Sequence, residues 1–271
     1  MRLDIVIPAH NEQQRIGPTL ERYLRAASGA DRDVRLLVAL DDCTDATADV
    51  VGGYAAADPR VRAFRYPRLG KGGVILETFR RCEAELVGFV DADCATPPQE
   101  LLRLARTVVD EDCDAAIASR WHPASLVPGR RAWRRRAASA GFALAVRRVM
   151  RLPYRDTQCG AKVVRAEAMR RLVPLVSSRD FLFDVDLLAV ARSLGLRVAE
   201  VPTVWVDQDG SRLAAGRDGR RMAASLLRLW VHHHTLPVRL PAAPAVSPEQ
   251  GRPALRPVRL HPREGAGRRA A

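Results

Sequence analysis

Lysine and aromatic residues are scarce in this sequence. Aromatic side chains make up 5% of its 271 residues, and Lys71 and Lys162 are the only lysines, although the net charge is +13. Nucleic-acid-binding proteins commonly interleave aromatic with basic side chains, because bases stack on the rings. We therefore expect no nucleic-acid partner. The arginine excess is either a compositional habit of the genome or a basic surface that attracts phosphates on nucleotides or anionic lipids.

Paired cysteines and long apolar runs are also missing. The five cysteines are odd in number and show no CxxC spacing, which is typical of free thiols in a reducing compartment. The apolar run Leu3 to Pro8 is too short for a signal peptide. The longest uncharged apolar stretch in the middle, Ala137 to Val146, is shorter than the ~20 residues of a spanning helix. We expect a cytoplasmic protein that is soluble or lies on the cytoplasmic face of a membrane.

Short apolar runs alternate with amphipathic stretches through the first half of the chain. This rhythm predicts an α/β fold, a mostly parallel sheet with helices on both faces. Ligands of such sheets bind at the carboxyl ends of the strands. We expect strands at 3–8, 34–40, 61–66, 86–90 and 115–118, and helices at 12–28, 44–57, 72–84 and 98–110.

The second half of the chain is less regular. The expected helices run from the basic segment at 130–136 to Met150, then over 165–173 and 184–194, with strands at 160–164 and 197–201. An amphipathic segment follows at 217–233. We expect one main domain at 1–213, a C-terminal helix within 214–236, and a disordered basic tail at 237–271, where hydrophobic periodicity ends.

Two carboxylates, Asp91 and Asp93, follow the apolar strand expected at 86–90. At a strand end, such a pair can hold a hard divalent cation, which in turn neutralises a diphosphate. A solvated acidic turn is the structural alternative. The position after a buried strand favours the metal site.

Asp41 and Asp42 also come directly after an expected strand. A carboxylate there can accept a hydrogen bond from a base or a ribose. Thr44 and Asp45, which follow, can equally cap the next helix.

A glycine-rich segment, Gly70 to Gly73, precedes the third expected helix and contains Lys71. Glycines let the backbone approach a phosphate, and a lysine at a helix N-terminus favours an anion. The segment is not a Walker A sequence, so an ordinary turn is the alternative.

These fragments resemble the ordered motifs of family-2, GT-A-type glycosyltransferases, in particular the dolichyl- and polyprenyl-phosphate glucosyl- and mannosyltransferase branch. The resemblance covers about residues 3–213. It rests on VIPAHNE at 6–12, DDCTD at 41–45, GKGG at 70–73, DADCAT at 91–96, SR at 119–120, DTQCGAK at 156–162 and FDVDLL at 183–188, with 205–211 continuing it. Departures are His10 for a tyrosine, Cys94 for a glycine and Asp186 for a glutamate.

On the donor side, the resemblance implies a pocket for a nucleotide diphosphate sugar, either UDP-glucose or GDP-mannose, with glucose favoured. Asp41 would accept from the base, and Lys71 would lie near the phosphates. Asp91 and Asp93 would hold the ribose and a Mg²⁺ or Mn²⁺ ion. The residues implied in donor binding are Pro8, Ala9, Asn11, Glu12, Asp41, Lys71, Asp91, Ala92 and Gln158.

On the acceptor side, the resemblance implies inverting transfer of a hexose to a polyprenyl phosphate held by Arg120. The next candidate for this contact is one of Arg130, Arg131 or Arg134. Asp156, Gln158 and Lys162 would shape the acceptor or sugar side. A phosphate is largely ionised at neutral pH, since its second pKa is about 6, so it needs orientation rather than a strong base. The alternative is a soluble sugar or metabolite acceptor. A hydroxyl acceptor would require a base, for which Asp184 is the candidate.

Two basic amphipathic segments can lie on a membrane or pack in the core. On the first, Ala132 to Met150, the residues expected on one side are Trp133, Ala137, Gly141, Leu144 and Met150. On the second, 217–233, the choice is the same. The histidines 232–234 are consecutive and do not share one helical face, so we expect no metal site there.

Overall fold

A computed structural model describes residues 1–128, 133–206 and 217–235; the side chains of 133–138 and 217–221 are not described. The described chain lies within one compact unit, Met1–Val238. Its sheet has seven strands in the order β3-β2-β1-β4-β6-β5-β7. The strands are β1 (Arg2–Ala9), β2 (Asp33–Asp41), β3 (Val61–Tyr66), β4 (Leu86–Phe89), β5 (Ala115–Ser119), β6 (Lys162–Arg165) and β7 (Val198–Pro202).

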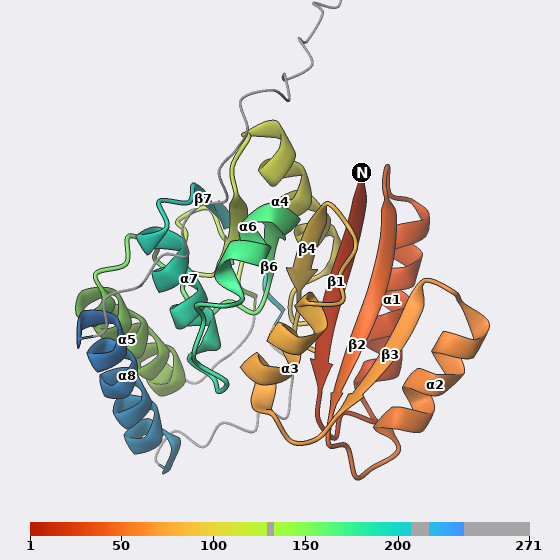
Figure 1. Ribbon diagram of the computed structural model, residues 1–271, viewed down its shortest axis with the longest axis horizontal. Helices are drawn as coiled ribbons and strands as arrows, with labels where there is room; N and C mark the ends of the chain where they lie inside the picture. Colours follow the sequence, from red (N-terminus) through yellow and green to blue (C-terminus); the bar gives the residue numbers. More distant parts are fainter. Residues whose placement is uncertain (129–132, 207–216, 236–271) are drawn as a thin grey trace, which may run out of the picture. The chain divides into compact units, whose positions relative to one another are not determined.

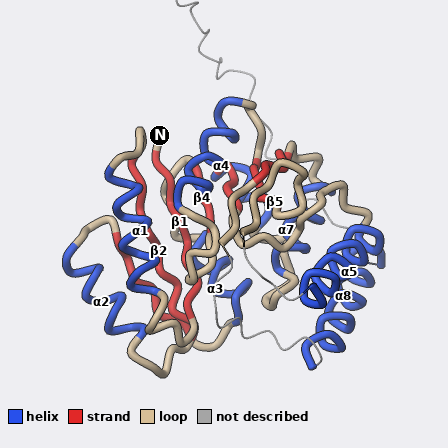
Figure 2. The backbone as a smooth tube through the Cα atoms, turned by 180° about the vertical axis from the view of Figure 1, so that it is seen from behind, coloured by secondary structure: helices blue, strands red, loops and turns tan. Residues whose placement is uncertain are grey.

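Helices cover both faces of this sheet (Figures 1 and 2), as the alternating pattern predicts. One face packs on α1 (Ile16–Ser28), α2 (Thr47–Ala57) and α4 (Pro98–Asp110). The other packs on α3 (Gly70–Phe79), α6 (Ala166–Leu172) and α7 (Phe183–Ser193). The apolar stripes of the helices and the buried strands supply the core, which the sequence pattern located correctly.

β6 runs antiparallel to both of its neighbours, β4 and β5, while the other strand pairs are parallel. The expectation of a mostly parallel sheet is therefore confirmed, with one reversed strand. The reversal brings the segment just before β6 to the carboxyl end of β4. This places residues 156–161 beside Asp91.

Three helices begin or end differently from the sequence expectation. The first begins at Ile16 rather than residue 12; ahead of it, the amide of Glu12 donates to Thr47 Oγ1 at 2.7 Å. The third ends at Phe79 rather than 84, since the buried Asp4 carboxylate accepts from the amide of Ala84 at 3.2 Å. The second begins at Thr47 rather than 44, because the Asp45 carboxylate accepts from the Thr47 amide.

A third apolar cluster joins α5 (Trp133–Met150) to α8 (Arg217–Thr235), and Figure 1 shows the two helices side by side. Val146 and Met150 are buried there, whereas Leu144 is 49% exposed. The expectation that Leu144 and Met150 share one side is wrong, because six residues turn a helix through about 240° net of full turns. The side chains of Trp133 and Ala137, and the tail at 237–271, lie outside the described residues.

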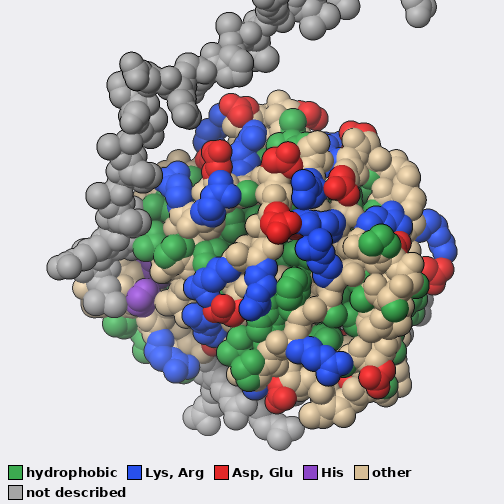
Figure 3. All heavy atoms as spheres, turned by 45° about the vertical axis from the view of Figure 1, so that its right-hand side comes forward, with side chains coloured by type: hydrophobic (Ala, Val, Ile, Leu, Met, Phe, Trp, Pro, Cys, Tyr) green, Lys and Arg blue, Asp and Glu red, His purple; other side chains and the backbone are tan. Residues whose placement is uncertain are grey.

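On the face in Figure 3, basic and acidic side chains are interspersed. Local pairs such as Arg60–Asp58 at 2.7 Å and Arg25–Glu21 at 2.7 Å account for some of the arginines. Within the part of the chain that is described, none of the helices is both long and apolar enough to cross a bilayer.

Candidate active site

The ends of β1 and β2 are tied together by side chains of the first two motifs. The Asn11 Oδ1 atom accepts the amide of Thr44 at 2.8 Å, and Asn11 itself has a φ of 55°. The ring of His10 bonds the carbonyl of Asp41 at 2.6 Å. Pro8 and Ala9 end β1 beside these residues. The nucleotide-side residues expected from sequence therefore converge on one edge of the sheet, and their binding role stays a prediction.

Asp41 is buried, and its carboxylate holds the loop that precedes α3. Its two oxygens accept from the amides of Leu69 at 2.7 Å and Gly70 at 3.2 Å. Arg68 lies 3.6 Å from the same carboxylate. These contacts give Asp41 a structural role next to Lys71. The predicted hydrogen bond to a base stays a prediction.

The glycines of the 70–73 segment allow close packing against the 178–183 segment. Gly70 has a φ of +77°, and a Cβ on Gly72 would lie 2.6 Å from the Cβ of Phe183. The amides of Gly72 and Gly73 both donate to the carbonyl of Arg179. Two amides at this helix N-terminus are thus already bonded within the protein. The phosphate-cradle interpretation therefore rests on Lys71 rather than on these amides.

Both lysines of the chain meet at Asp184. Lys71 Nζ lies 2.8 Å from Asp91 Oδ1 and 3.4 Å from Asp184 Oδ2. Lys162 is fully buried, and its Nζ lies 2.5 Å from Asp184 Oδ1 and donates to the carbonyl of Cys159 at 2.7 Å. Burial lowers the pKa of Lys71, but Asp184 and Asp91 outweigh it, and the pKa is raised above the ordinary lysine value.

The two carboxylates of the 91–93 motif differ in their surroundings. Burial raises the pKa of Asp91, but the neighbouring Lys71 outweighs this and holds the pKa below its ordinary value. For Asp93, burial and the charge of Asp91 raise the pKa. Its Oδ1 accepts only the amide of Ala95, at 3.0 Å, among the contacts of the described residues. The carbonyl of Ala92 accepts from Thr19 Oγ1 at 2.8 Å, so its part here is structural.

These two carboxylates fit a divalent cation that takes its remaining ligands from a diphosphate and water. Asp93 is a carboxylate with a raised pKa and no cationic side chain within 4 Å in the described part of the chain. No group of three or more His, Cys, Asp or Glu side chains suited to a metal occurs among the described residues. Mg²⁺ commonly binds through one or two carboxylates plus substrate phosphates, which this set can provide.

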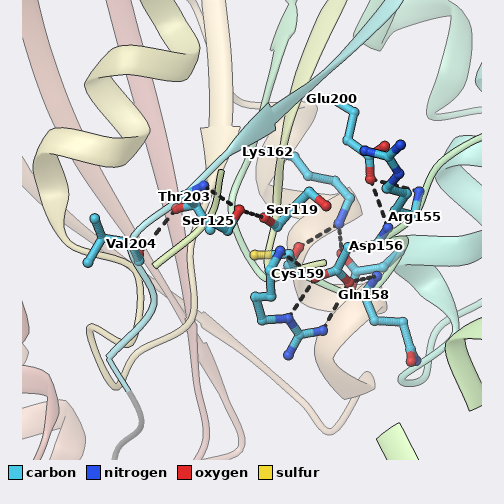
Figure 4. Close-up of polar contacts among 12 residues, drawn as sticks. Ser119, Ser125, Arg155, Asp156, Gln158, Cys159, Lys162, Glu200, Thr203 and Val204 are labelled. Atoms are coloured by element: carbon cyan, nitrogen blue, oxygen red, sulfur yellow. Dashed lines mark hydrogen bonds and ion pairs between the residues drawn. The ribbon is translucent and has the colours of Figure 1, made fainter. Parts of the chain in front are cut away.

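Arg120, which is partly exposed, forms a bidentate pair with the buried Asp156 (Figure 4 shows Asp156 and its surroundings). Arg120 Nε and Nη2 donate to the two Asp156 oxygens at 2.7 and 3.0 Å. The Asp156 amide donates to Glu200 Oε1 at 2.9 Å, and Arg120 stacks on the Trp205 ring at 4.9 Å. Burial lowers the pKa of the guanidinium, but Asp156 more than offsets this and raises it. Arg120 is therefore a fixed cation, oriented on both sides.

Gln158 joins this group through its backbone rather than through its carboxamide. Its amide donates to Asp156 Oδ1 at 3.2 Å, and its side chain points away from that carboxylate in Figure 4. The next residue, Cys159, is buried, and burial followed by the charge of Asp156 raises the pKa of its thiol to about 12. Gln158 and Cys159 therefore position the segment that reaches Lys162.

A pocket of about 160 Å³ is lined by Trp121, which follows Arg120, and by Arg155, which precedes Asp156. One side of α5 completes the lining with Ala140, Ala143, Leu144 and Arg147. The other candidates for a phosphate ligand, Arg130, Arg131 and the side chain of Arg134, lie outside the described residues. Arg147 and Arg155 were missed, because only the fold brings them to this pocket.

A second contact that the sequence did not indicate joins α7 to α8. Asp186 Oδ1 lies 2.7 Å from His233 Nε2, and its Oδ2 accepts from the amides of Ser177 and Ser178. Burial raises the pKa of Asp186, but the hydrogen bond from His233 and these amides outweigh it and hold the pKa below its ordinary value. His233 thus anchors the C-terminal helix, which no local pattern around 232–234 reveals.

The charged cluster at the strand ends, the DxD carboxylates and the order of motifs point to a sugar-nucleotide enzyme, and comparison with known proteins decides the family. A model described as glycosyl transferase family 2 matches residues 4–172. The chain belongs to glycosyl transferase family 2. It is 30% identical over 246 residues to the Drosophila melanogaster dolichyl-phosphate beta-glucosyltransferase, a match covering 86% of the chain and 76% of that enzyme.

Further likenesses in this family extend to an archaeal enzyme and to a solved structure. Glycosyltransferase AglD of Haloferax volcanii is 31% identical over 238 residues, which are 85% of the chain but only 37% of AglD. The crystal structure of Mycobacterium tuberculosis glucosyl-3-phosphoglycerate synthase, with Mn²⁺, UDP and glucosyl-3-phosphoglycerate, matches with a TM-score of 0.65 at 18% identity, over 87% of this chain and 80% of that one. This likeness confirms the GT-A fold.

Proposed function

We propose that this family-2 enzyme transfers a hexose, glucose in preference to mannose, from a nucleotide diphosphate sugar to a polyprenyl phosphate, with inversion at the anomeric carbon. The carrying observation is the pocket next to the chain neighbours of Arg120 and Asp156. It has two cations, Arg147 and Arg155, and an apolar wall of Ala140, Ala143 and Leu144 along α5. A phosphate with an apolar chain has both features. The Drosophila relative is named for a dolichyl-phosphate acceptor, which supports the same choice.

The polar atoms around Arg120 support a ligand at this point. Ser119 Oγ, Thr157 Oγ1 and Trp205 Nε1 are buried without a hydrogen-bond partner in the described part of the chain. Ser119 precedes Arg120, Thr157 follows Asp156, and Trp205 stacks on the guanidinium. Buried donors of this kind cost free energy unless they are bonded. Oxygens of the acceptor phosphate or of the donor sugar can satisfy them.

The acceptor phosphate needs no strong base in this mechanism. Its second pKa of about 6 leaves it largely ionised at neutral pH, so a phosphate oxygen attacks the anomeric carbon once Arg120 has oriented it. The planar guanidinium suits this because its remaining N–H groups can grip phosphate oxygens. Asp184, the candidate base for a hydroxyl acceptor, has both oxygens beside lysines, which favours a positioning role instead.

Asp91 and Asp93 would hold Mg²⁺ or Mn²⁺ against the donor diphosphate. When bound, that ion stabilises the charge that develops on the departing nucleotide. Lys71, which touches Asp91, adds a second positive charge at the same place. The Asp41-anchored loop fixes the start of α3 and therefore the position of Lys71.

Contact with a membrane surface follows from the acceptor and from the exposed side of α8. Leu227 is 61% exposed and Val231 41%, with Trp230 at 37% between them, while Leu226 and Leu229 pack in the core. Arg228 lies among these residues. An apolar helix side flanked by basic residues can enter the headgroup layer. We place the enzyme on the cytoplasmic face of the membrane that carries its acceptor.

The test is transfer of radiolabelled sugar from UDP-glucose, with GDP-mannose in parallel, to a polyprenyl phosphate in detergent with Mg²⁺ or Mn²⁺. We expect lipid-extractable label from UDP-glucose. Asp93→Ala should lower the rate by about 10²–10³-fold, because it removes an electrostatic contact at the charge that develops. The exposed Asp110→Ala is the matched control and should keep full activity. Label found only in water-soluble product would favour a soluble acceptor.

A further inference from the structure

The ammonium of Lys71 lies where a cation bound to Asp91 would lie. We propose that Lys71 is a stand-in cation, which occupies Asp91 while the donor site is empty and is exchanged for the divalent metal when the donor diphosphate binds. Metal and donor then bind cooperatively, and Asp184 is the positioning residue that holds the displaced ammonium in the site. The inference rests on the proposed donor chemistry, but it does not depend on which acceptor is used.

The geometry at Asp91 favours the exchange, because the Lys71 ammonium occupies the carboxylate oxygen that faces away from Gly160. Asp91 Oδ1 is 2.8 Å from Lys71 Nζ. Asp91 Oδ2 lies against the backbone of Gly160, so closely that a Cβ at that position would overlap it. The side chain is still 34% exposed. A cation approaching Oδ1 from solvent therefore meets the Lys71 ammonium first.

Lys71 has a second place to go because Asp184 is fixed independently of it. Asp184 is 2% exposed, and its other oxygen is held by the fully buried Lys162 at 2.5 Å. Lys71 is 3.4 Å from the free oxygen of Asp184 and its side chain is 21% exposed. A small movement therefore releases Asp91 while the ammonium stays near a carboxylate. A lysine suits this role, since its charge is compact and its stem flexible, whereas arginine makes a rigid fork.

The charges predict that metal and nucleotide diphosphate each raise the affinity for the other. Lys71 and Lys162 balance Asp91 and Asp184, so the four side chains are neutral together. A divalent cation arriving alone must compete with the Lys71 ammonium at short range. A nucleotide diphosphate brings negative charge that both the metal and Lys71 can neutralise. By linkage, the diphosphate must raise the metal affinity by the same factor by which the metal raises the diphosphate affinity.

Mn²⁺ titration monitored by electron paramagnetic resonance measures this coupling without any transfer reaction. For the unmodified enzyme we expect UDP, with GDP tested in parallel, to raise the Mn²⁺ affinity about tenfold or more. For Lys71→Met we expect tighter Mn²⁺ binding in the absence of nucleotide, and a coupling factor reduced by about tenfold. Arg62→Met removes a charge from an exposed position on β3 and should change neither value. Unchanged or weaker Mn²⁺ binding by folded Lys71→Met would overturn the proposal.

A second measurement follows the unmodified site, and a substitution serves only to assign the signals. The chain has two lysines, so [¹⁵N]lysine labelling gives two side-chain ammonium signals, and Lys71→Arg assigns them. We expect Mg²⁺ alone to leave both signals in place, and Mg²⁺ with the nucleotide diphosphate to move the Lys71 signal and not that of Lys162. A Lys71 signal that stays unchanged under saturating Mg²⁺ and nucleotide would overturn the exchange. Neither measurement uses an acceptor. A failure of lipid labelling would therefore count against the proposed acceptor alone, and a failure of these two measurements against the exchange alone.

Discussion

Two groups of paired acidic and basic side chains lie in different parts of the fold and are built differently. At the start of β1, Asp4 faces its cross-strand partner Arg35, and two N–H···O bonds join them at 2.7 and 2.8 Å. The amides of Glu83 and Ala84 also donate to Asp4. In the second group, Lys71 is shared between two carboxylates and partly exposed. We call the first group closed, because each Asp4 oxygen is bonded within the protein, and the second open, because Lys71 and Asp91 are partly exposed to solvent.

The difference shows how buried charge serves structure in one place and chemistry in another. Bidentate arginine and backbone amides satisfy Asp4 fully, so its surroundings resist rearrangement. In the open group, the Lys71 ammonium is shared between the carboxylates of Asp91 and Asp184. The nearby carboxylate of Asp93 has no cationic partner among the described residues. Such incomplete satisfaction favours binding of a further charged group.

The largest expected effect on stability belongs to the closed group. Asp4→Asn removes a charge that Arg35 needs, and breaking a buried pair costs about 3–5 kcal/mol in the free energy of unfolding. Chemical denaturation of the purified protein measures it. Asp33→Asn, at the same end of the sheet but 66% exposed, should change the value by less than about 0.5 kcal/mol. An equal loss in both variants would contradict the distinction.

We expect an intermediate effect on stability and on sugar transfer at Gly160, whose backbone lies against Asp91 of the open group. In Gly160→Ala, the new Cβ overlaps Asp91 Oδ2, so the carboxylate or the 156–161 segment must move, at a cost of about 1–3 kcal/mol. Sugar transfer should fall by about tenfold to 100-fold for the same free energy. Gly53→Ala has no atom within 4 Å of its Cβ and should stabilise α2 by up to about 1 kcal/mol. Full transfer activity of Gly160→Ala would refute the close approach.

The smallest effect concerns the link between α7 and α8. Because the folded pKa of Asp186 is lowered, its contribution to stability is present above its ordinary pKa of about 4 and is lost as pH falls through the folded value. His233→Gln should cost about 1–2 kcal/mol at neutral pH and make the loss of stability in acid smaller, because the folded pKa of Asp186 then lies closer to its ordinary value. Thermal denaturation between pH 3 and 7 tests this, with His234→Gln as control. Superimposed pH profiles for the two variants would argue against the link.

The sequence predicted those strands and helices that are determined by residues close together in the chain. The apolar runs located β1 to β5, and the acidic residues after β1, β2 and β4 meet at one sheet edge because parallel strands end together. The antiparallel direction of β6 has no such signal, since it depends on how a distant segment returns. The early end of α3 was missed for the same reason: the residue that takes its following amides, Asp4, lies far away in the sequence.

The sequence predicted which residues belong to the candidate site better than it predicted which residues contact one another there. Asp91, Asp93, Lys71 and Arg120 were all named from their motifs, but the partners that orient them were not. Asp156 binds Arg120 across 36 residues of sequence, and Asp184 binds Lys71 across 113. Only the folded chain brings these residues together. Asp4 carried a usable signal, since a carboxylate inside an apolar strand has to find a buried partner.

The lysine distribution has a practical consequence for chemical work on the enzyme. Lys71 and Lys162 are the only side-chain primary amines of the chain, and Lys162 has no exposed surface. Lys71 is therefore the one side-chain amine within reach of acylating reagents, and its raised pKa keeps it protonated and slow to react. If Lys71 lies beside the donor diphosphate as proposed, an amine-selective electrophile shaped like a nucleotide sugar would label this single side chain and abolish sugar transfer.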